Sequence, residues 1–193
     1  MGRYNFGKPD QEINLEEFKE ALEKSRLPKQ QKAYLVILYW LGCRRSEPLA
    51  ILEEDIEERD NSLFVSIHFR MNDKGERIPF SRGKRGQAGG ATELPLEYYG
   101  VNLVKEVWQK TKKGKKVFAF SDDTGYRAVQ KLFPHKTPHW FRYNRITKLR
   151  KRLGTDVTID GIKSFTGIRR DSTIQDYGLK TKADIHKIAE ILD

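Results

Sequence analysis

Apolar residues recur at helical spacing near the start of the chain. Residues 15–22 place leucine and phenylalanine on one face, and Asn14 followed by Glu17 matches a capping box, so a short amphipathic helix is predicted. Pro28 opens a second predicted helix. Because residues 33–42 are almost continuously apolar, we expect this helix to be buried on most sides.

The end of the second helix leads into a charged corner. Gly42 is the expected end of the helix, and Arg44 follows it directly. Ser46 is the predicted N-cap of a third helix, with Pro48 in its first turn. The sequence therefore predicts Arg44 in a tight corner between two helices.

From Asn61 onwards the pattern changes from helical to alternating. Residues 62–69 alternate and are rich in aromatic and β-branched residues, residues 76–80 and 92–96 are two further short extended segments, and Gly, Asn and Asp separate all three. We predict that they form a three-stranded antiparallel sheet. Residues 81–91, "SRGKRGQAGGA", are the predicted hairpin that joins its last two strands.

Helical periodicity returns in three segments of the second half, residues 96–113, 124–133 and 138–154. The sequence contains no internal repeat and no linker that divides it. The predicted fold class is therefore α+β, mainly helical, with a small three-stranded antiparallel sheet. We expect a single domain over 1–193, with an N-terminal arm and helix at 1–28, a core at 29–180 and a C-terminal helix at 181–193.

The charge of the chain indicates an anionic partner. The formal net charge is +10 and the isoelectric point is about 9.6, which favours nucleic acid over an acidic membrane surface. A lysine-rich solubilising surface is the alternative that charge alone leaves open. Acidic residues gather at 10–23 and basic residues at 142–152, so a phosphate-facing side is expected in the second half.

The location predicted from the sequence is the cytoplasm, in association with the nucleic-acid partner. Cys43 is the only cysteine, which excludes an intramolecular disulfide. The longest apolar run, residues 33–42, is too short to cross a bilayer, and no signal peptide precedes it. No metal-binding cluster is evident among the four histidines and the single cysteine.

Three motifs carry the candidate chemistry. The motifs are "GCRRSEPLAILEEDI" at 42–56, "TPHWFRYNRIT" at 137–147 and "FTGIRRDSTIQDYG" at 165–178. In their order and spacing they resemble the two arginine boxes and the nucleophile segment of the tyrosine recombinases, the phage-integrase family. Each motif alone is weakly specific, but three in this order with strands between the first two are specific.

The resemblance implies a catalytic domain that cleaves and rejoins duplex DNA through a 3′-phosphotyrosyl intermediate. It assigns Arg44, His139 and Arg142 to the two boxes and the nucleophile to Tyr177, with Tyr143 as the next candidate. Guanidinium groups bind the charge on the non-bridging phosphate oxygens, and a histidine can donate a hydrogen bond or move a proton near neutral pH. Because the phosphotyrosyl bond conserves the bond energy, no cofactor is required.

The family takes its general acid for the departing 5′ oxygen from a lysine in a β-hairpin. Lys84 is the predicted acid here. The segment is longer than is usual in the family, so Lys74, Arg82 and Arg85 remain alternatives. Each site residue also has a structural interpretation: Arg44, for example, can act as a cation at the helix C-terminus or as the ion-pair partner of Glu47.

Two departures from the family keep other functions open. Ile168 stands where the family has His or Trp, and an aliphatic group cannot donate a hydrogen bond, although Arg169 or Arg170 can replace it. A DNA-binding protein that has lost cleavage is therefore one alternative, and a type IB topoisomerase-like enzyme is another. Few residues precede the first box, so we expect either a fragment that holds the catalytic domain or a minimal enzyme without the N-terminal DNA-clamping domain that is usual in the family.

Further residues are predicted to contact partners. The residues expected to bind DNA phosphates are Arg82, Arg85, Arg145, Lys148, Arg150 and Lys151. Residues 181–193 carry an apolar stripe formed by Ile185, Ile188, Ala189 and Leu192, which can pack within the chain or against a neighbouring protomer. We expect self-association on DNA, as a dimer or tetramer, through this C-terminal helix.

Overall fold

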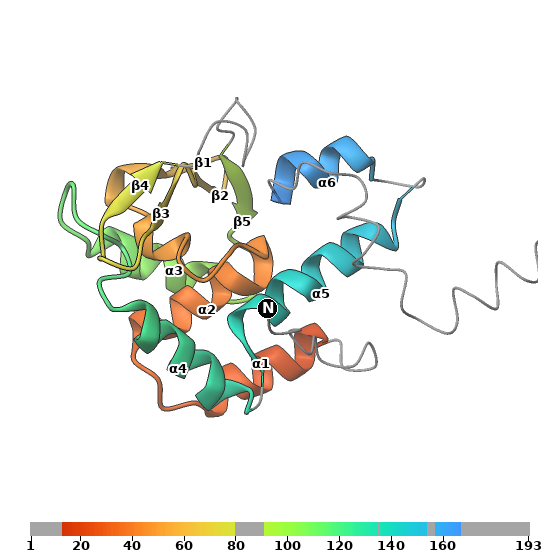
Figure 1. Ribbon diagram of the computed structural model, residues 1–193, viewed down its shortest axis with the longest axis horizontal. Coiled ribbons are helices and arrows are strands. Elements are labelled where there is room, and N and C mark those ends of the chain that lie inside the picture. The colour runs from red at the N-terminus through yellow and green to blue at the C-terminus, as the bar shows by residue number, and fades with distance from the viewer. Residues whose placement is uncertain (1–12, 80–90, 135, 154–156, 167–193) are drawn as a thin grey trace, which may run out of the picture.

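The computed structural model describes residues 13–79, 91–134, 136–153 and 157–166 (Figure 1). The helices are α1 (Leu15–Lys24), α2 (Lys29–Leu41), α3 (Val101–Gln109), α4 (Asp122–Leu132), α5 (Pro138–Arg150) and α6 (Ile159–Thr166), with the 3-10 turns η1 (Pro48–Ala50) and η2 (Glu53–Asp55). The strands are β1 (Ile56–Arg59), β2 (Ser62–Val65), β3 (Phe69–Met71), β4 (Arg77–Pro79) and β5 (Thr92–Pro95). The α+β, mainly helical fold class is thereby confirmed.

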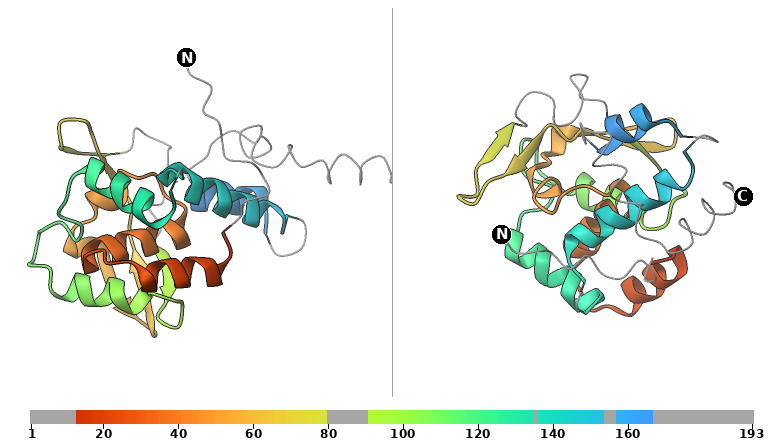
Figure 2. Two further views of the ribbon diagram at one scale, coloured as in Figure 1. Left: turned by 90° about the horizontal axis from the view of Figure 1, so that it is seen from below. Right: turned by 45° about the vertical axis from the view of Figure 1, so that its right-hand side comes forward.

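Helix α2 is the centre of the fold. It packs against α3, α4 and α5, and Figure 2 shows it between α4 and α3. The continuous apolar sequence that predicted a helix buried on most sides is explained by these three neighbours. Helix α1 closes the core as well, because Phe18 is fully buried and stacks on Tyr39 of α2 at 4.2 Å between ring centroids.

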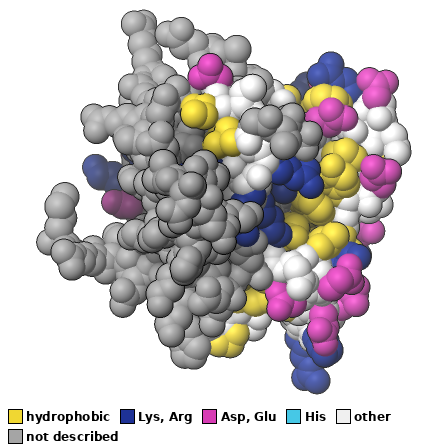
Figure 3. All heavy atoms as spheres, turned by 90° about the vertical axis from the view of Figure 1, so that its right-hand side faces the viewer, with side chains coloured by type: hydrophobic (Ala, Val, Ile, Leu, Met, Phe, Trp, Pro, Cys, Tyr) yellow, Lys and Arg dark blue, Asp and Glu magenta, His cyan; other side chains and the backbone are white. Residues whose placement is uncertain are grey.

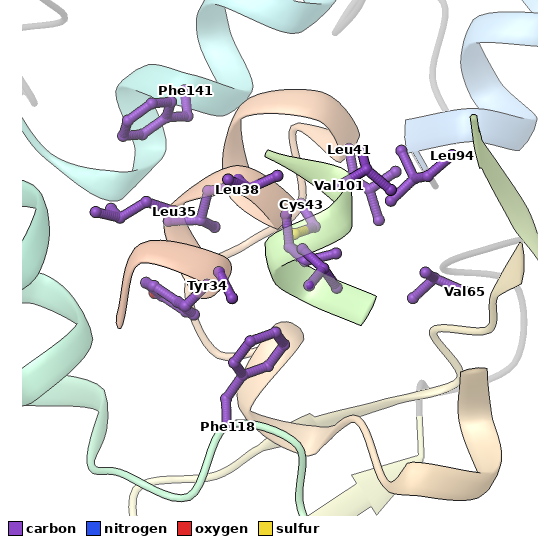
Figure 4. Close-up of a cluster of buried hydrophobic side chains, with 14 of the residues drawn as sticks. Tyr34, Leu35, Leu38, Leu41, Cys43, Val65, Leu94, Val101, Phe118 and Phe141 are labelled. Carbon is purple, nitrogen blue, oxygen red and sulfur yellow. The ribbon is translucent and has the colours of Figure 1, made fainter. Parts of the chain in front are cut away.

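One hydrophobic core joins helices and sheet (Figure 4). In this view Leu38 of α2 lies on the side of Phe141 of α5, and Leu41 of α2 lies beside Val101 of α3 and Leu94 of β5. A smaller cluster, with Ile146 and Ile162 as its buried members, packs α6 onto α5. None of the helices in the described part of the chain is both long and apolar enough to cross a membrane.

The three-stranded antiparallel sheet exists, but its membership differs from the prediction. Its order is β1-β2-β5, whereas β4 pairs with β3 in a separate two-stranded sheet. The prediction that residues 76–80 and 92–96 are neighbouring strands joined by a hairpin is therefore wrong. Residues 62–69 divide into two strands because β2 pairs with β5 and β3 turns away to form its own hairpin with β4.

The predicted third helix with Ser46 as its N-cap is also wrong. Only the single turn η1 forms, and the chain is extended again at Ile51, with φ −70° and ψ 122°. The physical reason is backbone pairing with residues 115–117: the N–H of Val117 donates to the Ile51 carbonyl at 3.0 Å, and the N–H of Glu53 donates to the Lys115 carbonyl at 2.9 Å. These bonds replace those that a helix would have made.

The β3–β4 hairpin is fastened to the corner that follows α2. The N–H of Met71 donates to the carbonyl of Ser46 at 3.1 Å. Arg77 donates to the carbonyl of Ala50 at 2.9 Å and forms an ion pair with Asp55 at 2.5 Å. The hairpin therefore supports the segment in which Arg44 lies.

Candidate active site

The site begins where α2 ends and α5 crosses it. Gly42 has φ +53°, a left-handed conformation that glycine adopts without strain, and its N–H donates to the Leu38 carbonyl. A Cβ atom at this position would lie 2.7 Å from Cβ of Arg145 and 3.6 Å from Cα of Arg142. A glycine is therefore required for the helix to stop here and for α5 to approach so closely.

Arg44 is held at the surface by a buried carboxylate. Glu47 is fully buried, and its two oxygens accept hydrogen bonds from the Arg44 main-chain N–H and the Arg44 guanidinium, both at 2.9 Å. The Arg44 side chain nevertheless remains 39% exposed. The structural and the functional interpretations of Arg44 are thus compatible, since the ion pair orients a guanidinium that stays accessible.

Arg142 joins the second motif to the first. Its side chain is 1% exposed, and its Nη1 donates to the carbonyl of Gly42 at 3.0 Å. The two residues are 100 positions apart in the sequence. A charged hydrogen bond between buried groups is strong and directional, so it fixes the second turn of α5 against the corner that carries Arg44.

His139 lies within electrostatic range of both arginines. It is on the first turn of α5, one turn before Arg142, and part of the residue is exposed to solvent while the protein shields its ring from water. The protein around its ring lowers the pKa of His139, and the positive charges of Arg142 and then Arg44 lower it further. The imidazole is therefore neutral at neutral pH, with one nitrogen as donor and the other as acceptor. The structure brings these three predicted residues together.

The remaining predicted catalytic residues lie outside the described part of the chain. They are Lys84, with its alternatives Arg82 and Arg85, and Ile168, Arg169 and Tyr177. Lys74 is described: it is exposed in the turn of the β3–β4 hairpin, where its N–H donates to the Asn72 side chain at 3.0 Å. Tyr143 is half-buried in α5.

The predicted DNA contacts on α5 divide into two groups. The Arg145 guanidinium lies 5.7 Å from the centroid of the Trp40 ring, and burial lowers its pKa. Lys148 donates to the carbonyl of Ile13 at 3.0 Å and lies 5.8 Å from the Tyr39 ring. These two cations contact α2 and the residue Ile13 before α1, whereas Arg150 is half-buried and Lys151 is exposed.

An aromatic surface adjoins these cations. Tyr98 is 38% exposed and stacks on Trp40 at 4.5 Å between centroids. Figure 3 shows Lys and Arg side chains beside a hydrophobic patch on the side of the molecule where α5 ends. Trp40 lies at the edge of the core, because its ring is half-buried and its N–H donates to the Tyr99 carbonyl at 3.0 Å.

Two supporting residues were not predicted. Arg45 forms an ion pair with Asp122 at the start of α4, at 2.8 Å, and so ties the corner to a third helix. Burial raises the pKa of Asp122, although the nearby charge of Arg45 lowers it. Nothing in the local sequence connects the two positions, which lie 77 residues apart. In the described ranges, no three His, Cys, Asp or Glu side chains converge as ligands of a metal ion.

Comparison with solved structures identifies the fold. No protein-family model and no curated protein matches the sequence. The structure of XerA recombinase superposes with a TM-score of 0.61 at 16% identity, over 91% of this chain and 61% of that chain. A Tn1549 transposon integrase in complex with circular intermediate DNA gives 0.61 at 17% identity, over 97% and 68%. XerH site-specific recombinase in a post-cleavage complex with palindromic difH substrate gives 0.62 at 17% identity, over 96% and 54%.

The chain therefore has the fold of a tyrosine recombinase catalytic domain. At 16–17% identity the likeness defines the fold alone. The chain spans about three fifths of the length of XerA recombinase, 61%.

Proposed function

We propose that the chain is a DNA strand-transferase, a site-specific recombinase or integrase that cleaves and rejoins duplex DNA through a 3′-phosphotyrosyl intermediate. The observation that carries the proposal is the convergence of Arg44, His139 and Arg142 at one corner, with the Arg44 guanidinium held by a buried carboxylate and still exposed. The third motif, at 165–178, contains Tyr177, which is the proposed nucleophile.

Each side chain has a role in the proposed transfer. The phenolic oxygen of Tyr177 attacks phosphorus, the bond from phosphorus to the 5′ oxygen breaks, and Lys84 gives that oxygen its proton. Arg44, which is exposed, binds the non-bridging oxygens, on which negative charge accumulates, and DNA binding uncovers the buried Arg142 so that it binds them as well. Neutral His139 donates one hydrogen bond or accepts the tyrosine proton. In the reverse step a 5′ hydroxyl attacks the phosphotyrosyl bond and Tyr177 is released with a proton.

The proposed partner is double-stranded DNA. Both the net charge of +10 and the exposure of Arg44 and Lys151 support this partner. The Tn1549 integrase and XerH were solved with DNA, which is consistent with the same class of partner. We further propose a single catalytic domain over 1–193 that acts with DNA in the cytoplasm and self-associates on it through 181–193.

The test is capture of a covalent adduct. The protein is incubated with a pool of nicked duplexes of varied sequence, in which the cleaved fragment diffuses away, and adducts are resolved on denaturing gels. Wild type should form an adduct, and Tyr177→Phe should form none while binding DNA with nearly unchanged affinity. Adducts of Tyr177→Phe at wild-type yield would move the nucleophile, and Tyr143 would be tested next.

The same experiment separates the alternative functions. Ile168 favours a protein that binds DNA without cleaving it, because it removes one donor from the third motif. DNA binding by wild type without any adduct would establish that alternative. Relaxation of supercoiled plasmid without a partner site would instead indicate a type IB topoisomerase-like enzyme.

A further inference from the structure

A cavity lined by lysines lies at the first turn of α2. Its volume is about 320 Å³, at the lower end of the range of small-ligand sites. Its lining includes one largely buried apolar residue, Val107. The charged side chains around it are Lys29, Lys110, Lys112, Lys115 and Lys116, with Glu106 as the one carboxylate in its described lining. Such a lining is suited to an anion and unsuited to an apolar ligand.

Most of this positive charge is not neutralised by the described residues. Lys29 forms an ion pair with Glu106 at 3.0 Å, between side chains that are 68% and 51% exposed. The bond to Lys29, and then the charge of Lys110, lower the pKa of Glu106, so it is ionised at neutral pH. Among described residues, Lys112, Lys115 and Lys116 have no carboxylate within ion-pair distance. Like charges therefore face a shared hollow.

The end of α2 adds to the positive potential. The N-cap is Pro28, which has no side-chain acceptor, and the first turn contains no acidic residue. The N-terminus of a helix carries a partial positive charge, and lysines near it are unfavourable because like charges repel. Without an anion, the repulsion between these lysines and the N-terminus of α2 lowers the stability of the fold, and a bound anion would relieve that repulsion.

We propose that this cavity binds phosphate groups at a site separate from the candidate active site. The source is either the DNA backbone away from the cleavage point or a free polyphosphate compound, since both present the same oxyanions. The two sites lie at opposite ends of α2, because Lys29 begins the helix and Arg44 follows its last residue, Leu41. At 1.5 Å per residue they are separated by roughly 20 Å along the axis.

The first experiment detects the site with sodium tripolyphosphate at low salt. Titration into the ¹⁵N-labelled protein should shift the backbone amide signals of Gln30 and Gln31, in the first turn of α2, with saturation. The double variant K112Q/K115Q should bind about tenfold more weakly or worse. Glu106→Gln should bind more tightly than wild type, because it removes the carboxylate that competes for Lys29.

The matched control removes two other exposed lysines. Lys113 lies in the same run and Lys24 at the end of α1, and neither lines the cavity. The variant K24Q/K113Q loses the same net charge and should keep wild-type affinity for tripolyphosphate. Without ligand, K112Q/K115Q should melt at the wild-type temperature or above, which separates lost binding from lost folding. Absence of the Gln30 and Gln31 shifts in wild type, or equal weakening in both double variants, would overturn the proposal.

The second experiment identifies the source of the phosphate. Binding of a fluorescent duplex is measured against salt in a Tyr177→Phe background, so that the result does not depend on cleavage. If the DNA backbone occupies the cavity, K112Q/K115Q should reduce the slope of log affinity against log salt by about two, and K24Q/K113Q should not. An unchanged slope together with lost tripolyphosphate binding assigns the site to a free polyphosphate compound. Absence of an adduct in the cleavage assay would leave both readouts intact.

Discussion

Replacing Glu47 with glutamine should release Arg44 from its fixed position. The carboxylate accepts two hydrogen bonds at 2.9 Å from Arg44, whereas an amide has one acceptor oxygen and would turn its NH₂ group toward a donor. Hydrogen bonds to charged groups contribute about 1.5–3 kcal/mol, so Glu47→Gln should lower the free energy of unfolding by that amount. The larger loss seen when a fully buried pair is broken is not expected, because Arg44 is 39% exposed and water can solvate it.

A double-mutant cycle isolates the side-chain contact. The free energies of unfolding of wild type, Glu47→Gln, Arg44→Gln and the double variant are measured by urea denaturation. The coupling should reach about 1 kcal/mol or more, above the usual value for exposed pairs. The control cycle uses the exposed pair of Lys24 and Glu20, for which the coupling should be close to zero.

The functional consequence of Glu47→Gln is measured in the adduct assay. Arg44 is still present in this variant but is less well oriented, so the rate should fall by up to roughly a hundredfold. A coupling energy within error of zero, with unfolding still two-state, would show that the ion pair does not hold Arg44. A normal rate of adduct formation would show that the ion pair between Arg44 and Glu47 is not needed for DNA cleavage.

Three further outcomes are expected. Gly42→Ala should destabilise the fold by about 2 kcal/mol or more in urea denaturation, because its φ is +53° and the new Cβ would lie 2.7 Å from another side chain; a loss near zero would contradict the close approach. An NMR titration of His139 should have its midpoint below the ordinary value of about 6.5, and stability held above that pH should be lost as pH falls, since the unfolded chain protonates first. Lys84→Ala should slow cleavage about 10²–10⁴-fold and be rescued by a 5′-bridging sulfur, whereas Arg44→Ala should not be rescued; equal slowing on both substrates would exclude Lys84 as the acid.

The features predicted correctly from sequence are those fixed by nearby residues. The capping box of α1 forms as expected, with the Asn14 side chain accepting from the N–H of Glu17 at 2.8 Å and the Glu17 side chain accepting in return. The left-handed Gly42 ends α2 at the predicted position. Both features depend on bonds between residues three or four positions apart, so a short window of sequence contains all the information they need.

Strand pairing was less predictable because it depends on distant segments. Leu63 pairs with Leu94, and the β3–β4 hairpin lies between them in the sequence. Strand β1 gives almost no signal, because in "IEER" only Ile56 is buried and the other three positions are exposed. A segment of this composition becomes a strand only because β2 offers it a hydrogen-bonding edge.

The candidate site shows the same division. The resemblance of two motifs to the arginine boxes of the tyrosine recombinases assigned Arg44, His139 and Arg142 to the site, and phosphoryl chemistry accounts for these residue types, since few side chains can bind and polarise a phosphate. Positive charge alone did not reveal what each cation contacts. Arg145 and Lys148 were predicted to bind DNA because they are basic, yet Arg145 lies against Trp40 and Lys148 against Tyr39.

The distribution of the basic residues therefore says more than the net charge of +10. At the C-terminal end of α2 each described arginine of the corner is bound by protein, Arg44 by Glu47 and Arg45 by Asp122. At the N-terminal end most of the lysines face a cavity instead. A paired cation is oriented for a defined contact, whereas clustered lysines with few acidic neighbours favour an anion that comes from outside. The two ends of one helix are thus suited to the two tasks proposed for them, orientation of a reacting phosphate at one end and retention of a phosphate group at the other.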